Sequence, residues 1–319
     1  MAYGKWTAAP YFYKDRPLII SHRGASGYIP ENSMQAYQVA GTMGTDYIEL
    51  DILVSKEGDL VIHHDITLDD TTNVAEFPNL SSYKTTKSVK KWNGTFKKTG
   101  WFAEDLTMEQ LKLLTLKQRK SMRPQSLNYY FHMPTLREVL EWLIEENVIR
   151  TNAKKELLGV VIETKYPGYF NELGYDVEKL LMDVLTDLQV SDIKQATDRC
   201  PIIIQSFELD SMIKIDKMTD LPTSYLMGSG GPTYNITEYV DIVSSLGVDF
   251  DFIFKDNEST GFVEKAHGLG FAVNGWTVRD DDLPSGLTAQ QFYDLMQVEG
   301  LDGAITEFPD SAYDFFSSS

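Results

Sequence analysis

The chain has 319 residues, of which 42% are hydrophobic, and its 29 basic and 47 acidic side chains give a formal net charge of −18. This length suffices for two average domains or one large α/β barrel with a substantial core. The acidic excess argues against general nucleic-acid binding, the single Cys200 excludes an intramolecular disulfide, and no apolar run approaches the ~20 residues of a membrane span.

Short runs rich in β-branched and other apolar residues alternate with longer segments of helical spacing. In chain order, the runs cover residues 18–21, 47–52, 160–164, 202–206, 223–227, 251–254, 272–277 and 303–306. Near-continuous apolar strands separated by helices are typical of a parallel sheet covered on both faces. Eight such units predict an α/β fold, a (β/α)8 TIM barrel that occupies residues 1–319 as a single domain.

The segments between these runs carry helix signals. Apolar residues at helical spacing predict helices over residues 34–42, 135–147, 175–188 and 236–246. Asn32 or Ser33 is a suitable N-cap for the first of these helices. Glu31, just before the cap, has two open roles: it is part of the helix start, or it holds Arg23 or the shell of a metal site.

One further run, residues 60–64, is separated from the second strand only by a turn, so it is expected to return as the second arm of a hairpin. The long connection that follows predicts an inserted subdomain over about 66–133, above the barrel mouth. Lysines alternate there with aromatic residues, which fits either a solvated basic face or a patch that steers an anionic substrate. These residues are Tyr83, Lys84, Lys87, Lys90, Lys91, Trp92, Phe96, Lys97, Lys98, Trp101 and Phe102.

Three acids stand at the ends of neighbouring predicted strands. Glu49 and Asp51 are two positions apart, so both point the same way, roughly 7 Å apart along the backbone. Alone, such a pair is usually a surface or ion-paired couple. Glu163, at the end of the next barrel strand, completes an oxygen-rich set suited to one divalent cation, Mg2+ or Ca2+.

Two histidines accompany these acids. His22 ends the first strand beside Arg23, and His64 is followed by Asp65, which can orient the ring. Each histidine alone is more often a satisfied core or rim residue. Together they form a plausible acid and base pair next to a metal site.

Two other side chains complete the set of candidate residues. Lys165 points the same way as Glu163, so it can neutralise a phosphate oxygen or simply pair with Glu163 or Asp51. Trp276 is either a rim aromatic against which a substrate packs or a core residue.

In family order, these residues resemble the glycerophosphodiester phosphodiesterase family over residues 18–310, in its longer, bacterial periplasmic-type branch. The matching motifs are His22-Arg23-Gly24-Ala25, Pro30-Glu31-Asn32-Ser33, Glu49-Leu50-Asp51, His64-Asp65, Glu163-Thr164-Lys165, Gln205-Ser206-Phe207, Gly275-Trp276-Thr277-Val278 and Gly303-Ala304-Ile305-Thr306-Glu307. The chain departs from the family pattern at Thr306-Glu307, where Thr-Asp is usual, and at Thr164, which replaces an aliphatic residue. Neither departure is expected to touch the proton-transfer or metal groups.

The resemblance implies a metal-dependent TIM barrel that hydrolyses glycerophosphodiesters to sn-glycerol 3-phosphate and an alcohol, through a cyclic phosphate. Carried over by position, it implies metal binding by Glu49, Asp51 and Glu163, phosphate binding by Arg23 and Lys165, and glycerol contact by Trp276. His22 and His64 transfer protons, as base and acid respectively.

Two other functional readings stay open. A phosphatidylinositol phospholipase C-like or sphingomyelinase D-like phosphodiesterase also combines two histidines with an acidic metal site. A non-catalytic barrel that binds phosphate ligands is a third possibility, although the presence of both histidines and all three acids argues against it. The expected partner is a small-molecule substrate rather than nucleic acid or a membrane, while the oligomeric state is left open. Residues 1–10 show no signal-peptide pattern, which leaves the compartment open as well: periplasmic or extracellular if a leader was removed, cytoplasmic otherwise.

Overall fold

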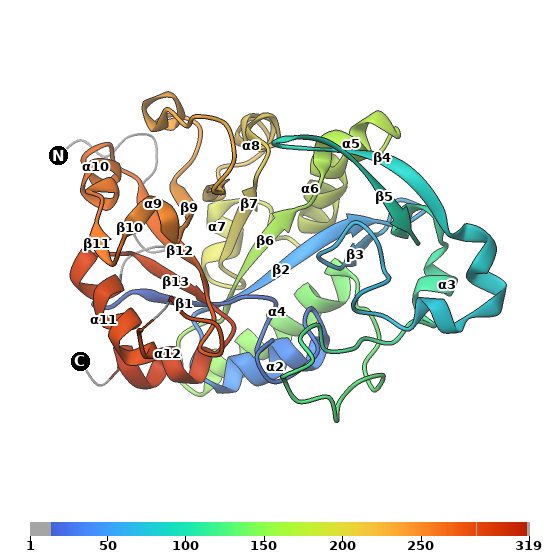
Figure 1. The fold of residues 1–319 in the computed structure, drawn as a ribbon, viewed down its shortest axis with the longest axis horizontal. Helices are drawn as coiled ribbons and strands as arrows, with labels where there is room; N and C mark the ends of the chain where they lie inside the picture. Colours follow the sequence, from blue (N-terminus) through green and yellow to red (C-terminus); the bar gives the residue numbers. More distant parts are fainter. Residues whose placement is uncertain (1–13, 285, 318–319) are drawn as a thin grey trace.

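The computed structural model describes residues 14–284 and 286–317, so the N-terminal segment used above for the compartment lies outside the described residues. Parallel strands form a closed barrel surrounded by helices, which confirms the predicted TIM barrel (Figure 1). The strands are β1 (Leu18–Ser21), β2 (Tyr47–Val54), β6 (Gly159–Thr164), β7 (Ile202–Ser206), β8 (Thr223–Met227), β9 (Ser245–Asp249), β12 (Ala272–Val278) and β13 (Gly303–Thr306). The barrel closes because β1 pairs with both β13 and β2.

Apolar side chains fill both sides of this sheet. A small cluster occupies the barrel interior, with two alternate residues of β1 and one residue from each of five other strands: Leu18, Ile20, Tyr47, Val161, Ile203, Ala272 and Ile305. The intervening residues, such as Ile19, Ile48 and Val160, belong to the larger core between the strands and the outer helices. Burial on both faces explains why the strands read as nearly continuous apolar runs.

The outer helices follow their cap signals. Helix α2 (Met34–Thr42) is capped by Ser33, and α4 (Leu136–Asn152) begins with a capping box between Thr135 and Glu138. The others are α5 (Pro167–Glu172), α6 (Val177–Asp187), α7 (Ile193–Thr197), α8 (Leu209–Asp216), α10 (Phe262–Gly268), α11 (Ala289–Glu299) and α12 (Pro309–Phe316). Among the described helices, none combines the length and apolarity needed to cross a membrane.

The sixth strand was predicted at the wrong place. The structure has strand β9 at Ser245–Asp249, whereas the predicted strand at 251–254 falls largely in the short helix α9 (Phe250–Ile253). Asp249 ends the strand and caps α9 by accepting a hydrogen bond from the backbone of Asp251. The predicted helix at 236–246 is only a 3-10 turn, η4 (Ile236–Tyr239). The aromatic residues of 250–254 resemble a buried strand in sequence, but they pack outside the barrel. The ring centroids of Phe250 and Phe292, for example, are 4.7 Å apart.

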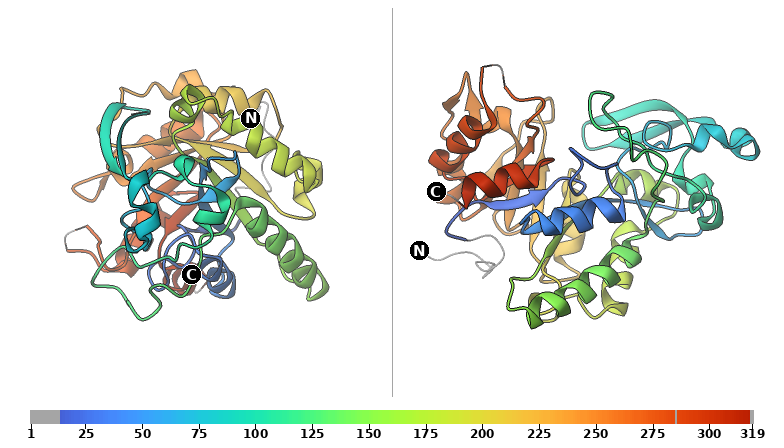
Figure 2. Two further views of the ribbon diagram at one scale, coloured as in Figure 1. Left: turned by 90° about the vertical axis from the view of Figure 1, so that its right-hand side faces the viewer. Right: turned by 90° about the horizontal axis from the view of Figure 1, so that it is seen from below.

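Residues between β2 and α4 form an excursion from the barrel. Strand β3 (Leu60–Ile62) runs antiparallel to β2, which confirms the predicted hairpin. Beyond it lie η1 (Val74–Glu76), η2 (Pro78–Tyr83), the ribbon of β4 (Thr85–Lys91) and β5 (Gly94–Gly100), η3 (Ala103–Asp105) and α3 (Met108–Leu111). Figures 1 and 2 show this segment extending to one side of the barrel, with the β4–β5 ribbon beside α5.

Four of the six lysines between residues 84 and 98 have identifiable partners. Lys84 lies 3.7 Å from Asp69, Lys87 2.8 Å from Glu104, and Lys90 3.0 Å from Glu172. The Lys91 ammonium lies over the rings of Trp92 and Phe96. Much of the basic charge is therefore engaged in holding the ribbon to its surroundings.

Candidate active site

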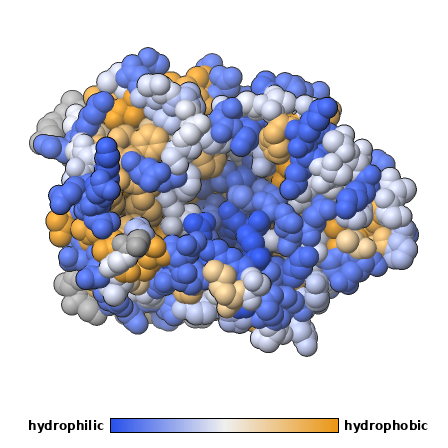
Figure 3. Space-filling view, viewed as in Figure 1, coloured by the Kyte–Doolittle hydropathy of each residue, from blue (hydrophilic) through white to orange (hydrophobic). Residues whose placement is uncertain are grey.

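Polar side chains replace the apolar interior at the C-terminal ends of the barrel strands. Because alternate residues of a strand point the same way, the positions after the interior cluster face the open end of the barrel. They line a pocket of about 270 Å3, and Figure 3 shows a hydrophilic hollow on this face. Its lining includes seven of the eight predicted site residues: His22, Arg23, Glu49, His64, Glu163, Lys165 and Trp276. The eighth, Asp51, is only 1% exposed.

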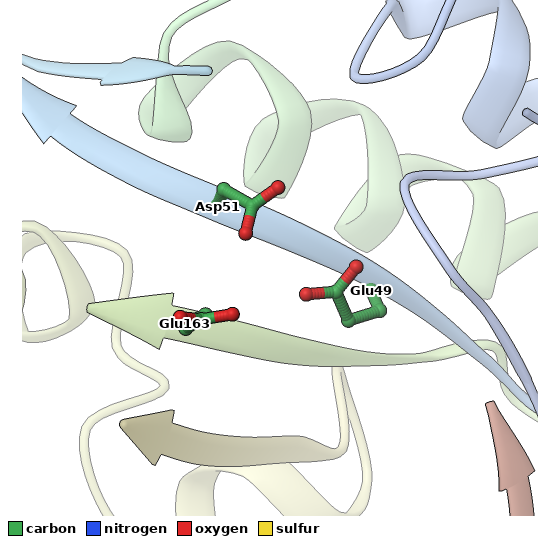
Figure 4. A group of neighbouring side chains, drawn as sticks. All are labelled: Glu49, Asp51 and Glu163. Carbon is green, nitrogen blue, oxygen red and sulfur yellow. The ribbon is translucent and has the colours of Figure 1, made fainter. Parts of the chain in front are cut away.

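The structure brings the three predicted metal ligands together. Asp51 of β2 pairs in register with Glu163 of β6, and Glu49 lies two positions before Asp51. Each residue offers a carboxylate oxygen, and these oxygens lie within 4.8 Å of one another (Figure 4). The spacing follows from strand register, which the sequence pattern had suggested.

The electrostatics of this acidic cluster favour a bound cation. Burial and the charges of Asp51 and Glu163 raise the pKa of Glu49 well above its ordinary value. Burial raises the pKa of Glu163 to about 7, against the attraction of Lys165. Asp51 Oδ1 is buried without a hydrogen-bond partner. A crowded, oxygen-only donor set with an unsatisfied oxygen fits a hard divalent cation such as Mg2+ or Ca2+.

Two basic side chains border the acids. Lys165 Nζ lies 2.8 Å from Glu163 and 3.4 Å from Asp51, so one of its predicted alternatives, ion pairing, is present. The Arg23 backbone donates to Glu49 (2.9 Å), and its guanidinium donates to Glu31 (2.9 Å). Of the two roles left open for Glu31, contact with Arg23 is therefore seen, while Ser33 caps the helix.

A tight turn presents Arg23 to the pocket. Arg23 and Gly24 both have positive φ, of 58° and 78°. A Cβ atom on Gly24 would lie 2.6 Å from the backbone of Ala36 in the following helix. Glycine is therefore required both by the backbone angle and by the close approach of α2.

His22 is held by a carboxylate that the sequence analysis had set aside. His22 Nδ1 lies 3.0 Å from Glu307 Oε1, so the expectation that the Thr306-Glu307 departure would not touch the proton-transfer groups was wrong. The contact follows from topology, since Ser21 and Thr306 are register partners on β1 and β13. Burial and the charge of Arg23 lower the pKa of His22 to about 4.

His64 is held in the same way by its neighbour. Its Nδ1 lies 2.7 Å from Asp65 Oδ1. Burial and the charges of Arg23 and Lys165 lower the pKa of His64 to about 3. Both rings are therefore neutral near pH 7 in this state, with Nδ1 hydrogens directed at carboxylates and Nε2 left as the acceptor.

Two arginines from one segment of the insert fix these carboxylates, and the sequence analysis missed both. Arg119 donates to Asp65 (2.7 Å) and to both oxygens of Glu31 (2.8 Å each). Arg123 donates to Glu307, which also accepts from Arg279 Nε at 2.9 Å. No local motif marks these arginines, because their partners lie far away in the sequence.

The hydrogen bonds of Glu307 with His22, Arg123 and Arg279 lead to a prediction about the stability of the fold. Burial opposes ionisation of Glu307, but the hydrogen bond to His22 and the charges of Arg279 and Arg123 hold its pKa well below the ordinary value. Because the folded state lowers the pKa of Glu307, the ionised carboxylate stabilises the fold at every pH above its unfolded-state pKa of about 4.3. This stabilisation decreases below that pH and is lost as the pH falls through the folded-state pKa.

We therefore expect Glu307→Gln to lower the free energy of unfolding by about 3–5 kcal/mol at pH 7, and by about 1–2 kcal/mol less than that at pH 3. Urea unfolding at the two pH values measures this difference. The exposed carboxylate of Glu264 supplies the control, Glu264→Gln, which should change little at either pH. Equal losses for Glu307→Gln at pH 7 and pH 3 would contradict the assignment.

Known proteins share the sequence pattern and the fold of this chain. A sequence profile of the glycerophosphoryl diester phosphodiesterase family matches residues 22–311. The chain is 30% identical over 331 residues to a glycerophosphodiester phosphodiesterase of Arabidopsis thaliana, covering 94% of this chain and 86% of that protein. It is 25% identical over 355 residues to a glycerophosphodiester phosphodiesterase of Haemophilus influenzae, covering 95% and 90%.

Solved structures share the fold. A phosphodiesterase of Oleispira antarctica, in complex with the product sn-glycerol-3-phosphate, has a TM-score of 0.66 and 19% identity over 95% of this chain and 97% of that one. The crystal structure of a protein from Silicibacter pomeroyi, described as a putative glycerophosphoryl diester phosphodiesterase, has a TM-score of 0.70 and 18% identity, covering 96% of this chain and 95% of that one. The profile match and the Arabidopsis relative together show that the chain belongs to the glycerophosphoryl diester phosphodiesterase family.

Proposed function

We propose that the protein hydrolyses glycerophosphodiesters to sn-glycerol 3-phosphate and an alcohol, with one divalent cation held by Glu49, Asp51 and Glu163. The observation that carries this proposal is the convergence of three carboxylates, two carboxylate-bound histidines and two cationic side chains at one pocket. Family membership and the product bound to the Oleispira structure support the choice of substrate.

Arg23 and Lys165 bind the phosphate in this proposal. Both side chains are buried cations, and each is held in place by an ion pair with an acid, Arg23 with Glu31 and Lys165 with Glu163. Their N–H groups are therefore already positioned to donate hydrogen bonds to a phosphate oxygen. Trp276 lines the same pocket and offers a flat surface to the glycerol carbons. A cation bound to the three acids would offset the negative charge that accumulates on the phosphate oxygens in the transition state.

The two histidines carry the protons. His22 accepts the proton of the neighbouring glycerol hydroxyl, whose oxygen bonds to phosphorus. His64, which takes up a proton at Nε2 when the substrate binds, gives that proton to the departing alcohol as its P–O bond breaks. The product of this step is a cyclic phosphate. Water then opens the ring with the roles reversed, which returns both histidines to their starting states. A bound phosphodiester anion offsets the positive charges that lower the pKa of His64, so it raises this pKa and favours uptake of the second ring proton at Nε2.

Arg119 is a positioning residue in this scheme. It bridges Asp65, which orients His64, and Glu31, which holds Arg23. Loss of such an outer partner typically costs about 10–100-fold in activity. We expect Arg119→Met to lower kcat in this range with a small change in KM, and Arg119→Lys to lower it less.

Steady-state kinetics measure this prediction, and added guanidinium ion should restore part of the Arg119→Met activity because the side chain is partly exposed. Arg137→Met serves as the control, because it removes an exposed ion pair between Arg137 on α4 and Asp187 on α6. An Arg119→Met enzyme with wild-type kcat would remove the positioning role.

Release of sn-glycerol 3-phosphate from glycerophosphocholine, with Mg2+ or Ca2+ present, tests the function as a whole. The proposal requires turnover that EDTA abolishes and either cation restores. Cleavage of phosphatidylinositol or sphingomyelin instead would favour the rival phosphodiesterases. Binding of glycerol 3-phosphate without turnover of any glycerophosphodiester would favour the non-catalytic barrel.

A further inference from the structure

A second hollow adjoins the pocket on the side of the β4–β5 ribbon. It has a volume of about 170 Å3 and lies between the ribbon tip and the loops after β6 and β7. His64, Glu163, Lys165 and Phe207 line both hollows, so the two are continuous around these residues. Lys91, Trp92, Tyr166 and Glu208 belong to the lining of the second hollow and are absent from that of the first.

The two histidines divide between these hollows. His22 and Trp276 line the first hollow and are not part of the second, whereas His64 faces both. In an in-line displacement at phosphorus, the attacking and leaving oxygens lie on opposite sides of the phosphorus atom. With the glycerol in the first hollow beside His22, the leaving oxygen faces His64 and its substituent extends into the second hollow.

Aromatic rings form one wall of the second hollow. Trp92, at the tip of the ribbon, stacks on Phe207 with ring centroids 5.3 Å apart and an angle of 17° between the planes. Tyr166 follows Lys165 directly and has a left-handed backbone, with φ of 49°. The ribbon therefore closes the hollow with side chains that are themselves packed and ordered.

Glu163 and Glu208 carry negative charge in the second hollow, and Lys91 and Lys165 carry positive charge. Lys165 is paired with Glu163 at 2.8 Å, so Glu208 is the acid that can pair with a positively charged ligand. The Glu208 carboxylate is held by a hydrogen bond of 2.9 Å from the backbone of Gly168. Lys91 carries the opposite charge, but its ammonium lies 5.4 Å from the centroid of Phe96 and 5.9 Å from that of Trp92, on the rings of its own ribbon. A fixed carboxylate beside aromatic rings is the arrangement that recognises ammonium groups in proteins.

We propose that the second hollow is the subsite for the leaving alcohol, and that Glu208, Trp92, Tyr166 and Phe207 select head groups bearing an ammonium group, such as choline or ethanolamine. This inference rests on the proposed function and assigns its substrate class. It also explains why the ribbon reaches from the insert to the loop after β7.

The test compares two substrates that differ in the charge of the alcohol, glycerophosphocholine and glycerophosphoglycerol. Wild-type enzyme should have the higher kcat/KM for glycerophosphocholine. Glu208→Gln should lower kcat/KM for glycerophosphocholine about tenfold and leave that for glycerophosphoglycerol within about twofold. Glutamine can still accept the Gly168 hydrogen bond, so the local fold is retained.

Glu145→Gln is the control, because Glu145 is an exposed carboxylate on α4 (Leu136–Asn152), away from the ribbon, and lines neither hollow. It should leave both substrates unchanged. Equal effects of Glu208→Gln on the two substrates, or no effect on either, would overturn the subsite while wild-type turnover still upheld the phosphodiesterase function. A wild-type enzyme that cleaves neither substrate would overturn both.

Discussion

Replacing His64 by alanine is expected to lower kcat by about 10²–10⁴-fold, the usual contribution of a general acid or base. His64 lies at the junction of the two hollows, and Asp65 fixes its ring at 2.7 Å. Alanine removes the group that protonates the leaving alcohol, but it leaves the acids and the phosphate-binding cations in place. KM should therefore change much less than kcat.

Substrates with different leaving alcohols can show whether His64 is the group that protonates the leaving oxygen. A substrate that releases a more acidic alcohol, such as p-nitrophenol, needs less protonation, so the loss caused by His64→Ala should shrink for it. His22→Ala should give a large loss for both substrates, because His22 acts on the attacking hydroxyl. The exposed His132 provides the control variant, His132→Ala. A His64→Ala enzyme with a near-wild-type rate on glycerophosphocholine would remove the assignment.

Replacing Asp51 by asparagine is expected to abolish tight cation binding and to lower activity by about 10²–10³-fold, the rate equivalent of several kcal/mol of charge stabilisation. Asp51 is the most strongly ionised of the three acids, since the charges of Lys165 and Arg23 lower its pKa despite burial. Asparagine preserves the shape of the side chain but removes that charge.

Calorimetric titration with Mg2+ and with Ca2+ measures this binding directly, independent of turnover. Asp59→Asn, on the exposed turn before β3, is the matched control and should bind like the wild type. Unchanged cation affinity in Asp51→Asn would show that the metal site lies elsewhere.

Much of the site could be predicted because strand geometry is local. Alternation along β2 and β6 places Glu49, Asp51 and Glu163 on one side of the sheet, and parallel register then brings the two strands' acids together. The barrel itself was evident from the repeated alternation of apolar runs and helices. These inferences depend only on residues within one strand–helix unit of the barrel or the next one along the chain.

The residues that were missed act over long distances. Arg119 contacts Asp65 and Glu31 from 54 and 88 residues away, and Arg123 reaches Glu307 from 184 residues away. Single arginines in an irregular segment carry no periodic signal, and only the path of the insert brings them to the rim. The stacking of Trp92 on Phe207 is equally non-local, so the sequence pattern showed the aromatic residues but not the surface they complete.

The misplaced sixth strand has a different cause. Strand β9 contains Gly247, which weakens its strand signal, yet a Cβ atom there would lie 2.5 Å from the Leu226 side chain on β8. The more apolar residues just after it are excluded from the barrel because Asp249 starts a helix. Close packing between strands thus outweighed local propensity.

The most direct test of the metal-centred site is anomalous diffraction from crystals soaked with Mn2+ and sn-glycerol 3-phosphate. One anomalous peak is predicted between the carboxylates of Glu49, Asp51 and Glu163, with the phosphate in contact with Arg23 and Lys165 and both His22 and His64 directed at it. A peak at another location, or a phosphate bound away from these two histidines, would contradict the account.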